Sequence, residues 1–164
     1  MRDRMSRQSM IGGLCSIAAT LGIASKPAAA GVEHFPVEHT EEEWRRLLTP
    51  EQFDVLRHHA TEQAFTSPLD HEHRPGIYLC AGCAQHLFDA RTKFDSGSGW
   101  PSFYEPLAHA VETSTDNSLF MERTEVHCRN CGGHLGHVFD DGPKPTGLRY
   151  CMNGVALRFD PKGS

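Results

Sequence analysis

The chain has 164 residues, of which 23% are charged and 38% hydrophobic, and its formal net charge is −5 at pH 7. That length fits one domain with one modest core and leaves little room for a second. A net negative surface repels phosphate backbones, so we expect no nucleic-acid partner.

Residues 1–30 have the layout of a secretory signal peptide. Three arginines precede an apolar stretch at residues 11–24, which is too short to span a bilayer stably. Three alanines end the segment, so we expect cleavage after Ala30, export to the periplasm or out of the cell, and no stable membrane anchor. The alternative is an N-terminus that stays on the chain, disordered or apposed to a membrane. Removing the segment, with its four basic residues and one acid, would take the net charge from −5 to −8.

Two short helices are expected after a linker at residues 31–39. Thr40 followed by Glu43 has the spacing of a capping box. Thr49 is a second candidate N-cap, because Pro50 suits the first helical position and Gln52 stands where a box partner should. Apolar side chains recur at helical intervals in both segments, namely Trp44, Leu47 and Leu48, then Phe53, Leu56 and Ala60.

The remainder of the chain has the texture of β-structure. From residue 77 onward, short apolar pieces are broken by Gly, Pro, Asp and Asn. The best strand candidate is residues 148–159, with a bulge expected at Gly154. We therefore expect a single α+β domain at residues 40–160 that is mainly β, with N-terminal helices packed on an antiparallel sheet curled towards a barrel.

Five cysteines follow the signal peptide, and four of them form two CxxC pairs. Glycine or asparagine between or after the thiols allows the tight turn that points both sulfurs of a pair at one ion. Zinc prefers four such ligands in a closed tetrahedron, so we expect one structural zinc ion per chain. Disulfides, including cross-pairs between the two motifs, are the alternative in an oxidising compartment. The expected zinc ligands are Cys80, Cys83, Cys128 and Cys131.

The fifth cysteine, Cys151, is the candidate nucleophile. On a strand, Arg149, Cys151 and Asn153 would share one face, with Tyr150 and Met152 on the other. An arginine beside a thiol favours the thiolate, which is the form that attacks. The alternative is an inert core cysteine, but arginine and asparagine on its own face would make a poor core environment.

Two histidines and an acid follow the second CxxC pair closely. His134 and His137 are candidate proton donors beside a thiol nucleophile, because imidazole titrates near working pH. Structural histidines are the alternative, and an HxxH without a nearby Glu is a weak signal for a catalytic metal. Asp141 is expected either to orient one of these histidines or to end a turn. The other histidines are expected to be solvated, among them His58, His59, His71 and His73.

A Gly-rich loop at residues 96–103 runs into two aromatic residues. A phosphate cradle would need a closing Lys and a following helix, and the sequence offers neither clearly. Trp100 is expected either to wall a pocket for an apolar or sulfur-containing group or to be an ordinary core residue.

Together, these ordered motifs resemble those of the methionine-R-sulfoxide reductases, the B-type peptide methionine sulfoxide reductases. The resemblance covers residues 40–159 and implies a β-barrel-like core with N-terminal helices, a four-cysteine zinc site and a catalytic cysteine matching Cys151. It is carried by CAGC at 80–83, FDSGSGWPSF at 94–103, HLGHVF at 134–139 and GLRYCMN at 147–153.

The resemblance also implies a reaction. Oxidised proteins or peptides would be the substrate, and Cys151 would become a sulfenic acid as methionine leaves. No nicotinamide or flavin motif is present, so an external thiol, such as that of a thioredoxin-like protein, is the expected reductant. Many family members carry a resolving cysteine where this chain has Ser98, which puts the usual intramolecular disulfide step in doubt. The residues implied around the sulfoxide are His134, His137, Asp141, Arg149 and Asn153, with Trp100 and Phe139 in contact with the substrate.

Two other classes of protein compete with this interpretation. A non-catalytic zinc module that binds a protein partner would keep Cys151 buried and unreactive. A zinc hydrolase using His134 and His137 would lose activity to chelators and ignore thiol alkylation.

Overall fold

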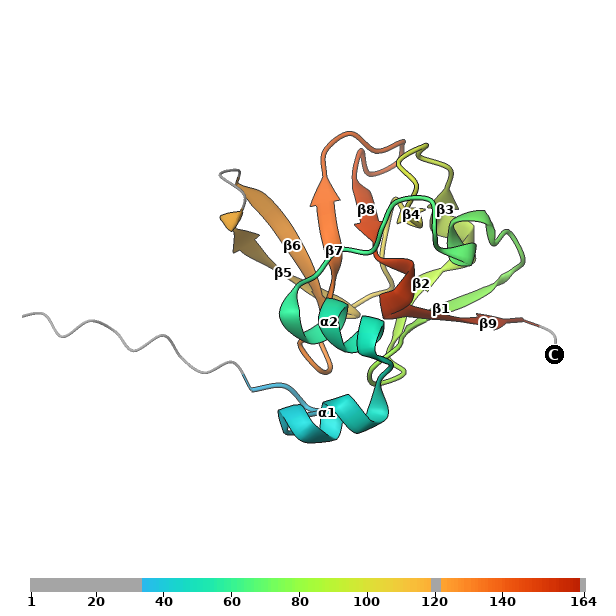
Figure 1. Cartoon of the computed structure of the whole chain (residues 1–164). Helices are drawn as coiled ribbons and strands as arrows, with labels where there is room; N and C mark the ends of the chain where they lie inside the picture. The colour runs from blue at the N-terminus through green and yellow to red at the C-terminus, as the bar shows by residue number, and fades with distance from the viewer. Residues whose placement is uncertain (1–33, 119–121, 163–164) are drawn as a thin grey trace, which may run out of the picture. The chain divides into compact units, whose positions relative to one another are not determined.

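The computed structural model describes residues 34–118 and 122–162 (Figure 1). The expected signal peptide and its cleavage site lie outside the described residues. Within the described ranges, no helix is long and apolar enough to cross a membrane.

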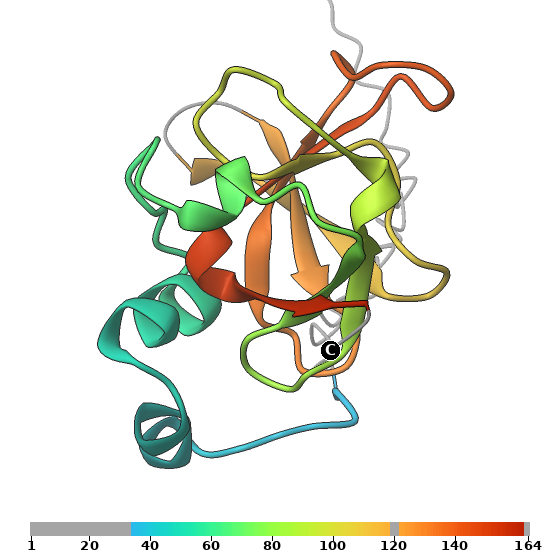
Figure 2. The same cartoon turned by 90° about the vertical axis from the view of Figure 1, so that its right-hand side faces the viewer.

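The described residues form two antiparallel sheets. This mainly β architecture with N-terminal helices confirms the predicted fold class. In spatial order, the larger sheet contains β3 (Lys93–Phe94), β4 (Ser102–Phe103), β8 (Arg149–Met152), β7 (His134–Phe139), β6 (Arg123–Cys128) and β5 (Val111–Asp116). The smaller sheet contains β2 (His86–Asp89), β1 (Gly76–Cys80) and β9 (Leu157–Pro161), and Figure 2 shows β9 in red beside green β1.

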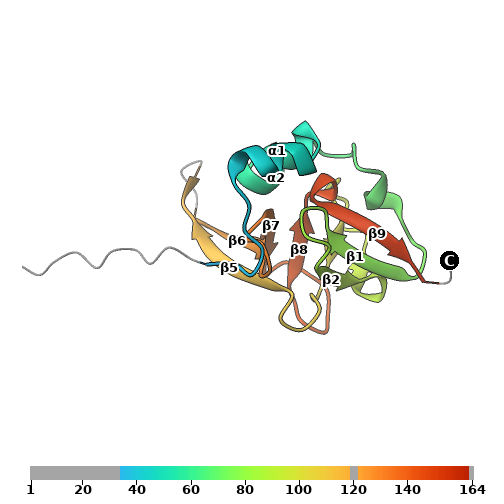
Figure 3. The ribbon, with the colours of Figure 1, turned by 90° about the horizontal axis from the view of Figure 1, so that it is seen from below.

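Two helices precede the sheets, and both begin where the sequence predicts. Helix α1 (Glu41–Leu47) follows Thr40, helix α2 (Pro50–His58) follows Thr49, and each has a complete capping box. In each box the threonine hydroxyl and a side chain three residues later satisfy two backbone N–H groups that the helix cannot pair itself. Both helices lie on one side of the sheets (Figure 3), where α2 packs against β7.

The predicted single strand at residues 148–159 is wrong. The chain leaves β8 through the short 3₁₀ turn η4 (Gly154–Ala156) and enters β9, which belongs to the other sheet. The Glu62 carboxylate holds this turn by accepting hydrogen bonds from the backbone N–H groups of Gly154 at 2.6 Å and Val155 at 3.3 Å. Gly154 marks a close approach rather than a bulge, because a Cβ there would collide with the Ser67 side chain.

One core joins the two sheets. The Phe88 ring of β2 stacks on the Phe103 ring of β4 with centroids 4.3 Å apart, and Tyr78 of β1 meets Phe103 edge-on at 4.9 Å. All three residues are fully buried, and burial of each such ring contributes roughly 1.5–3 kcal/mol. This packing fixes β4, and β4 in turn pairs with the strand that carries Cys151.

Candidate active site

Cys151 lies near the middle of the larger sheet, between β4 and β7. Strand register places it opposite Ser102 on β4 and opposite His137 on β7. Residues directly opposite in an antiparallel pair have their Cβ atoms about 4.5–5.5 Å apart and project to the same face. Backbone pairing therefore gives the thiol a hydroxyl neighbour on one side and an imidazole neighbour on the other.

Gly136 allows β7 to approach β8 closely beside the thiol. A Cβ at this position would collide with the backbone carbonyl oxygen of Cys151. Since backbone atoms cannot turn away as a flexible side chain does, any larger residue would push the two strands apart.

A small cavity of about 110 Å³ opens beside Cys151. Four predicted site residues reach it, namely Trp100, His137, Phe139 and Asn153. Trp100 therefore lines a cavity, and its contact with an apolar or sulfur-containing group stays a prediction. The remaining lining residues are Thr61, Arg123 and Gly136.

Glu62 holds two walls of this cavity through its backbone. Its carbonyl oxygen accepts a hydrogen bond of 3.0 Å from the Trp100 indole Nε1. Its N–H donates to Asn153 Oδ1 at 2.9 Å, while Asn153 Nδ2 donates to the Leu135 carbonyl at 3.1 Å. The indole ring and the buried amide are therefore fixed by the same residue, which also caps η4 with its carboxylate.

Asp141 pairs with Arg149 rather than with a histidine, which is neither of the two roles expected for it. Its two carboxylate oxygens each accept a hydrogen bond of 2.8 Å from the guanidinium, a bidentate geometry that fixes the plane of the arginine. The Arg149 guanidinium carbon lies 4.5 Å from the centre of the Phe139 ring. Arg149, which lies on the same strand as Cys151, is thus held between the Asp141 carboxylate and the face of the Phe139 ring.

Burial dominates the acidity of Cys151. Desolvation raises the pKa of the thiol above its ordinary value, while Ser98, Arg149 and Ser102 partly offset that rise. As predicted, Arg149 lowers the pKa of the thiol, but burial raises that pKa by more. Cys151 is therefore mainly a protonated thiol at neutral pH, and it would act as a nucleophile only with a group that removes its proton.

His137 is the histidine that reaches the cavity. Its Nε2 is 2.7 Å from Asp116 Oδ2, and Arg123 donates to the same carboxylate oxygen at 2.7 Å. Burial lowers the pKa of His137, and the pairing with Asp116 only partly reverses that effect. Its imidazole is therefore mainly neutral at pH 7 and can accept a proton.

His134 lies behind His137 and does not line the cavity. The two rings meet at a centroid distance of 5.4 Å, and His134 is 1% exposed. Its Nδ1 is 2.7 Å from Glu125 Oε1. Burial alone would raise the pKa of Glu125, but hydrogen bonds from His134, His59 and Ser114 hold that pKa well below its usual range. His59 is exposed, as predicted, and its Nδ1 also lies 3.0 Å from the same Glu125 oxygen, a contact that the sequence does not indicate.

Ser98 contacts the thiol directly. Its Oγ is 3.7 Å from Cys151 Sγ and 2.8 Å from Ser96 Oγ, which is 2.7 Å from Ser102 Oγ. The position at which a resolving cysteine would stand therefore lies beside Cys151 and carries a hydroxyl.

The four remaining described cysteines form a cluster at the ends of β1 and β6. Their Sγ atoms all lie within 4.8 Å of one another. Cys80 and Cys131 are 3.7 Å apart, and Cys83 and Cys128 are 3.5 Å apart. A disulfide needs about 2.05 Å, whereas the edges of a tetrahedral zinc–thiolate site are about 3.8 Å for 2.3 Å bonds. The cluster could therefore hold a zinc ion, and its thiols are free rather than paired in disulfides.

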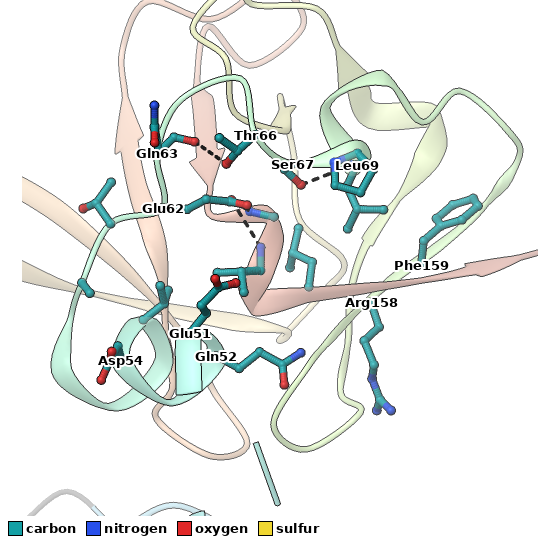
Figure 4. A pocket seen from close by; sticks show the side chains of 17 residues that line it. Glu51, Gln52, Asp54, Glu62, Gln63, Thr66, Ser67, Leu69, Arg158 and Phe159 are labelled. Atoms are coloured by element: carbon teal, nitrogen blue, oxygen red, sulfur yellow. Dashed lines mark hydrogen bonds between the residues drawn. The ribbon is translucent and has the colours of Figure 1, made fainter. Parts of the chain in front are cut away.

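A second, larger cavity of about 820 Å³ adjoins the first and shares Thr61 with it. Its walls are α2, residues 60–69 and residues 154–159 (Figure 4). The Glu62 carboxylate points from this cavity to η4, and Glu51 and Asp54 add acid to its α2 wall. Cys151 lines the smaller cavity and does not reach the larger one.

Several site residues have no signal in the sequence. Ser102 reaches the thiol only through strand register, and Glu62 acts through contacts with residues about 40 and 90 positions away. Asp116 and Glu125 hold the two histidines from neighbouring strands. A long-range pairing of strands cannot be read from residue spacing, which is why these partners were missed.

The fold and site define a cysteine-containing enzyme of the mainly β class, with a four-thiol cluster that does not include Cys151. The SelR domain family matches residues 48–161. The chain belongs to this family and, with it, to the MsrB group of peptide methionine sulfoxide reductases.

Similar proteins cover most of the chain. A peptide methionine sulfoxide reductase MsrB of Leptospira interrogans is 52% identical over 127 residues, which span 77% of this chain and 97% of that protein. The MsrB of Leifsonia xyli is 55% identical over 135 residues, 81% of this chain and 97% of that protein. The MsrB of Bradyrhizobium diazoefficiens is 56% identical over 124 residues, 75% and 89% of the two chains.

Proposed function

We propose that the protein is a thiol-dependent reductase that converts methionine-R-sulfoxide in peptides and proteins to methionine, with Cys151 as its nucleophile. The observation that carries this proposal is the half-buried thiol of Cys151 at a cavity walled by Trp100 and His137. Membership of the MsrB group supports the reaction.

The first chemical step transfers one oxygen atom. Cys151 sulfur attacks the sulfoxide sulfur and forms an S–S bond, the protonated oxygen then moves from the methionine sulfur to Cys151 sulfur, and the S–S bond breaks as methionine leaves as a thioether. The oxygen ends on Cys151 as a sulfenic acid, so the thiol loses two electrons and the sulfoxide gains them. A thiol and a sulfoxide are thus converted to a sulfenic acid and a thioether, and the reaction balances without any other reactant.

His137 moves the proton that this step requires. Its neutral imidazole is paired across β7 and β8 with Cys151 and accepts the thiol proton as the sulfur attacks. The resulting imidazolium is stabilised by Asp116 and returns the proton to the sulfoxide oxygen. His134 does not contact the substrate in this scheme; its ring packs against the ring of His137 and helps to position it.

The polar and apolar groups of the cavity bind opposite sides of the sulfoxide. The Trp100 and Phe139 rings offer an apolar surface to its methyl group. Asn153 Nδ2 uses one hydrogen on the Leu135 carbonyl, and its second hydrogen is free to bind the oxide oxygen. Fixing methyl and oxygen at separate walls allows the site to distinguish the two sulfoxide epimers.

An external thiol completes the cycle. The other four described cysteines belong to the zinc-type cluster, and Ser98 cannot form a disulfide. We infer that one donor thiol attacks the sulfenic acid and releases water, and that a second thiol then frees Cys151 as the donor disulfide leaves. A thioredoxin-like protein or a small dithiol has this chemistry.

The larger cavity favours a peptide over free methionine sulfoxide. The small cavity holds only the reacting end of the side chain, while the adjoining space of about 820 Å³ accepts the flanking polypeptide. Comparing kcat/KM for an oxidised peptide and for free methionine sulfoxide tests this preference.

The two rival classes fit the geometry less well. A non-catalytic zinc module needs no half-buried thiol at a cavity. A hydrolase would need His134 and His137 on one ion, but their paired nitrogens face different carboxylates, Glu125 and Asp116.

Export is part of the proposal. The residue pattern of the first thirty positions supports cleavage after Ala30 and delivery to the periplasm or outside the cell. Mass spectrometry of the protein from that compartment should give Gly31 as the N-terminus. Full-length chain found only in the cytosol would overturn this localisation.

Substitution of the nucleophile tests the function. Cys151→Ser should abolish reduction of an oxidised peptide with dithiothreitol as donor while leaving the melting temperature and metal content unchanged. Retained turnover in this variant would exclude Cys151 as the nucleophile.

A further inference from the structure

A second group of metal-ligating side chains lies away from the four cysteines. His59, Glu125 and His134 each place a donor atom within 4.8 Å of the other two. The two imidazole Nδ1 atoms approach the same oxygen, Glu125 Oε1, at 3.0 Å and 2.7 Å. Ser114 donates to the other carboxylate oxygen at 2.6 Å and so fixes the orientation of the carboxylate.

These separations suit a metal ion. Ligand atoms bound at 2.0–2.1 Å lie about 2.8–3.4 Å apart around octahedral or tetrahedral ions. The His59–Glu125 contact falls within this range, and the His134–Glu125 contact is slightly shorter. A widening of about one or two tenths of an ångström between Glu125 and His134 would make room for the ion, and the exposed His59 ring completes the set of ligands.

The burial of the three residues gives both rigidity and access. Glu125 and His134 are 8% and 1% exposed, so their positions are set by the sheet. The His59 side chain is 62% exposed and stands at the C-cap of α2 in the left-handed conformation. An ion can therefore reach the group from solvent on the His59 side.

The donor chemistry selects the class of ion. Two imidazoles and one carboxylate suit zinc, cobalt, nickel and copper better than magnesium or calcium, which prefer oxygen ligands. Three protein ligands also leave at least one position for water, unlike the closed four-cysteine cluster.

We propose that His59, Glu125 and His134 form a second metal site, which binds one divalent transition-metal ion and ties the end of α2 to β6 and β7. The site is separate from the four-cysteine cluster in ligand type and in exposure. It does not depend on the proposed reductase activity.

Cobalt titration of zinc-loaded protein tests the proposal. With the four cysteines already filled by zinc, native mass spectrometry should show one additional cobalt ion per chain, and calorimetry gives its affinity. Its absorption should lack the intense near-ultraviolet band of cobalt–thiolate bonds. His59→Ala should weaken binding by at least about tenfold, since even a change beyond the ligands costs metal affinity about 10–100-fold.

His58→Ala is the matched control. His58 is the neighbouring exposed histidine on α2 and contacts Asp54 instead of Glu125, so this variant should bind cobalt as the wild type does. Melting temperatures without metal verify that both variants are folded. The proposal is overturned if wild type takes up no additional ion at millimolar cobalt, if the additional ion shows thiolate absorption, or if His59→Ala binds as tightly as wild type.

Discussion

Ser98 Oγ lies 3.7 Å from Cys151 Sγ. The serine is flanked by Gly97 and Gly99, both of which have positive φ angles, so the loop turns sharply and brings residue 98 against the nucleophile. A hydroxyl at this distance can hydrogen-bond to the thiol but cannot form a disulfide with the oxidised sulfur.

Replacing this hydroxyl by a thiol should change the product of one turnover. In Ser98→Cys, the new thiol should attack the sulfenic acid, because the contact distance requires only a small movement to reach the disulfide length of about 2.05 Å. Wild type should be labelled by dimedone after sulfoxide treatment, and the variant should instead show a disulfide by peptide mapping. Ser96→Cys is the control, since Ser96 bonds to Ser98 and Ser102 rather than to Cys151. A wild-type disulfide between Cys151 and a cluster cysteine would contradict the account.

The reactivity of Cys151 should rise with pH from neutrality. Its pKa lies above the ordinary thiol value because of burial, so at pH 7 the protonated form predominates and raising the pH increases the thiolate fraction. Iodoacetamide alkylation of Cys151 in substrate-free protein, followed by mass spectrometry, should show a midpoint above that of an unfolded control peptide. A midpoint below that of the peptide would mean that Arg149 outweighs burial.

Loss of the Asp141 carboxylate should slow the reaction through Arg149. Without its bidentate partner, Arg149 would no longer be held near Cys151, where its charge lowers the pKa of the thiol. Asp141→Asn should reduce kcat/KM by roughly tenfold, about 1.4 kcal/mol, and move the alkylation midpoint upwards. Asp140→Asn, at the exposed neighbouring position, should leave both quantities unchanged. An unshifted midpoint in Asp141→Asn would remove the arginine from this role.

Glu62 should control activity by positioning rather than by contact with substrate. Its carboxylate caps η4, and its backbone holds Trp100 and Asn153. Glu62→Ala should lower kcat/KM by about tenfold or more and change Trp100 fluorescence, and Glu62→Gln should recover part of both because its amide oxygen still accepts a hydrogen bond. Gln63→Ala, on the same loop, is the control. Equal activity in wild type and Glu62→Ala would contradict the assigned role.

The four-cysteine cluster should govern stability rather than chemistry. Cys128→Ser removes one of four ligands, and because metal binding is coupled to folding the variant should lose zinc and unfold at a markedly lower temperature. Metal analysis and thermal denaturation measure both effects. Zinc-free wild-type protein with normal stability and activity would show the cluster to be dispensable.

Local features of the fold were predictable from the sequence. The capping boxes at Thr40 and Thr49 depend on residues three positions apart, and each CxxC pair is similarly local. The identity of Cys151 as the candidate nucleophile followed from its immediate neighbours and from family motifs.

Features that depend on distant contacts were not predictable. The break between β8 and β9 exists because Glu62 caps η4 from 92 positions away. The partner of Asp141 depends on the path of the chain between β7 and β8, and no spacing in the sequence distinguishes Arg149 from a histidine as that partner. Likewise, His137 rather than His134 reaches the cavity because of how β7 is placed against β8.

The most direct test of the central claim is the initial rate of reduction of separated R- and S-epimers of an oxidised peptide. The zinc-loaded protein with dithiothreitol should reduce the R-epimer and leave the S-epimer unchanged, because methyl group and oxygen bind to different walls of the Cys151 cavity. Reduction of the S-epimer, or of neither epimer, would contradict the account.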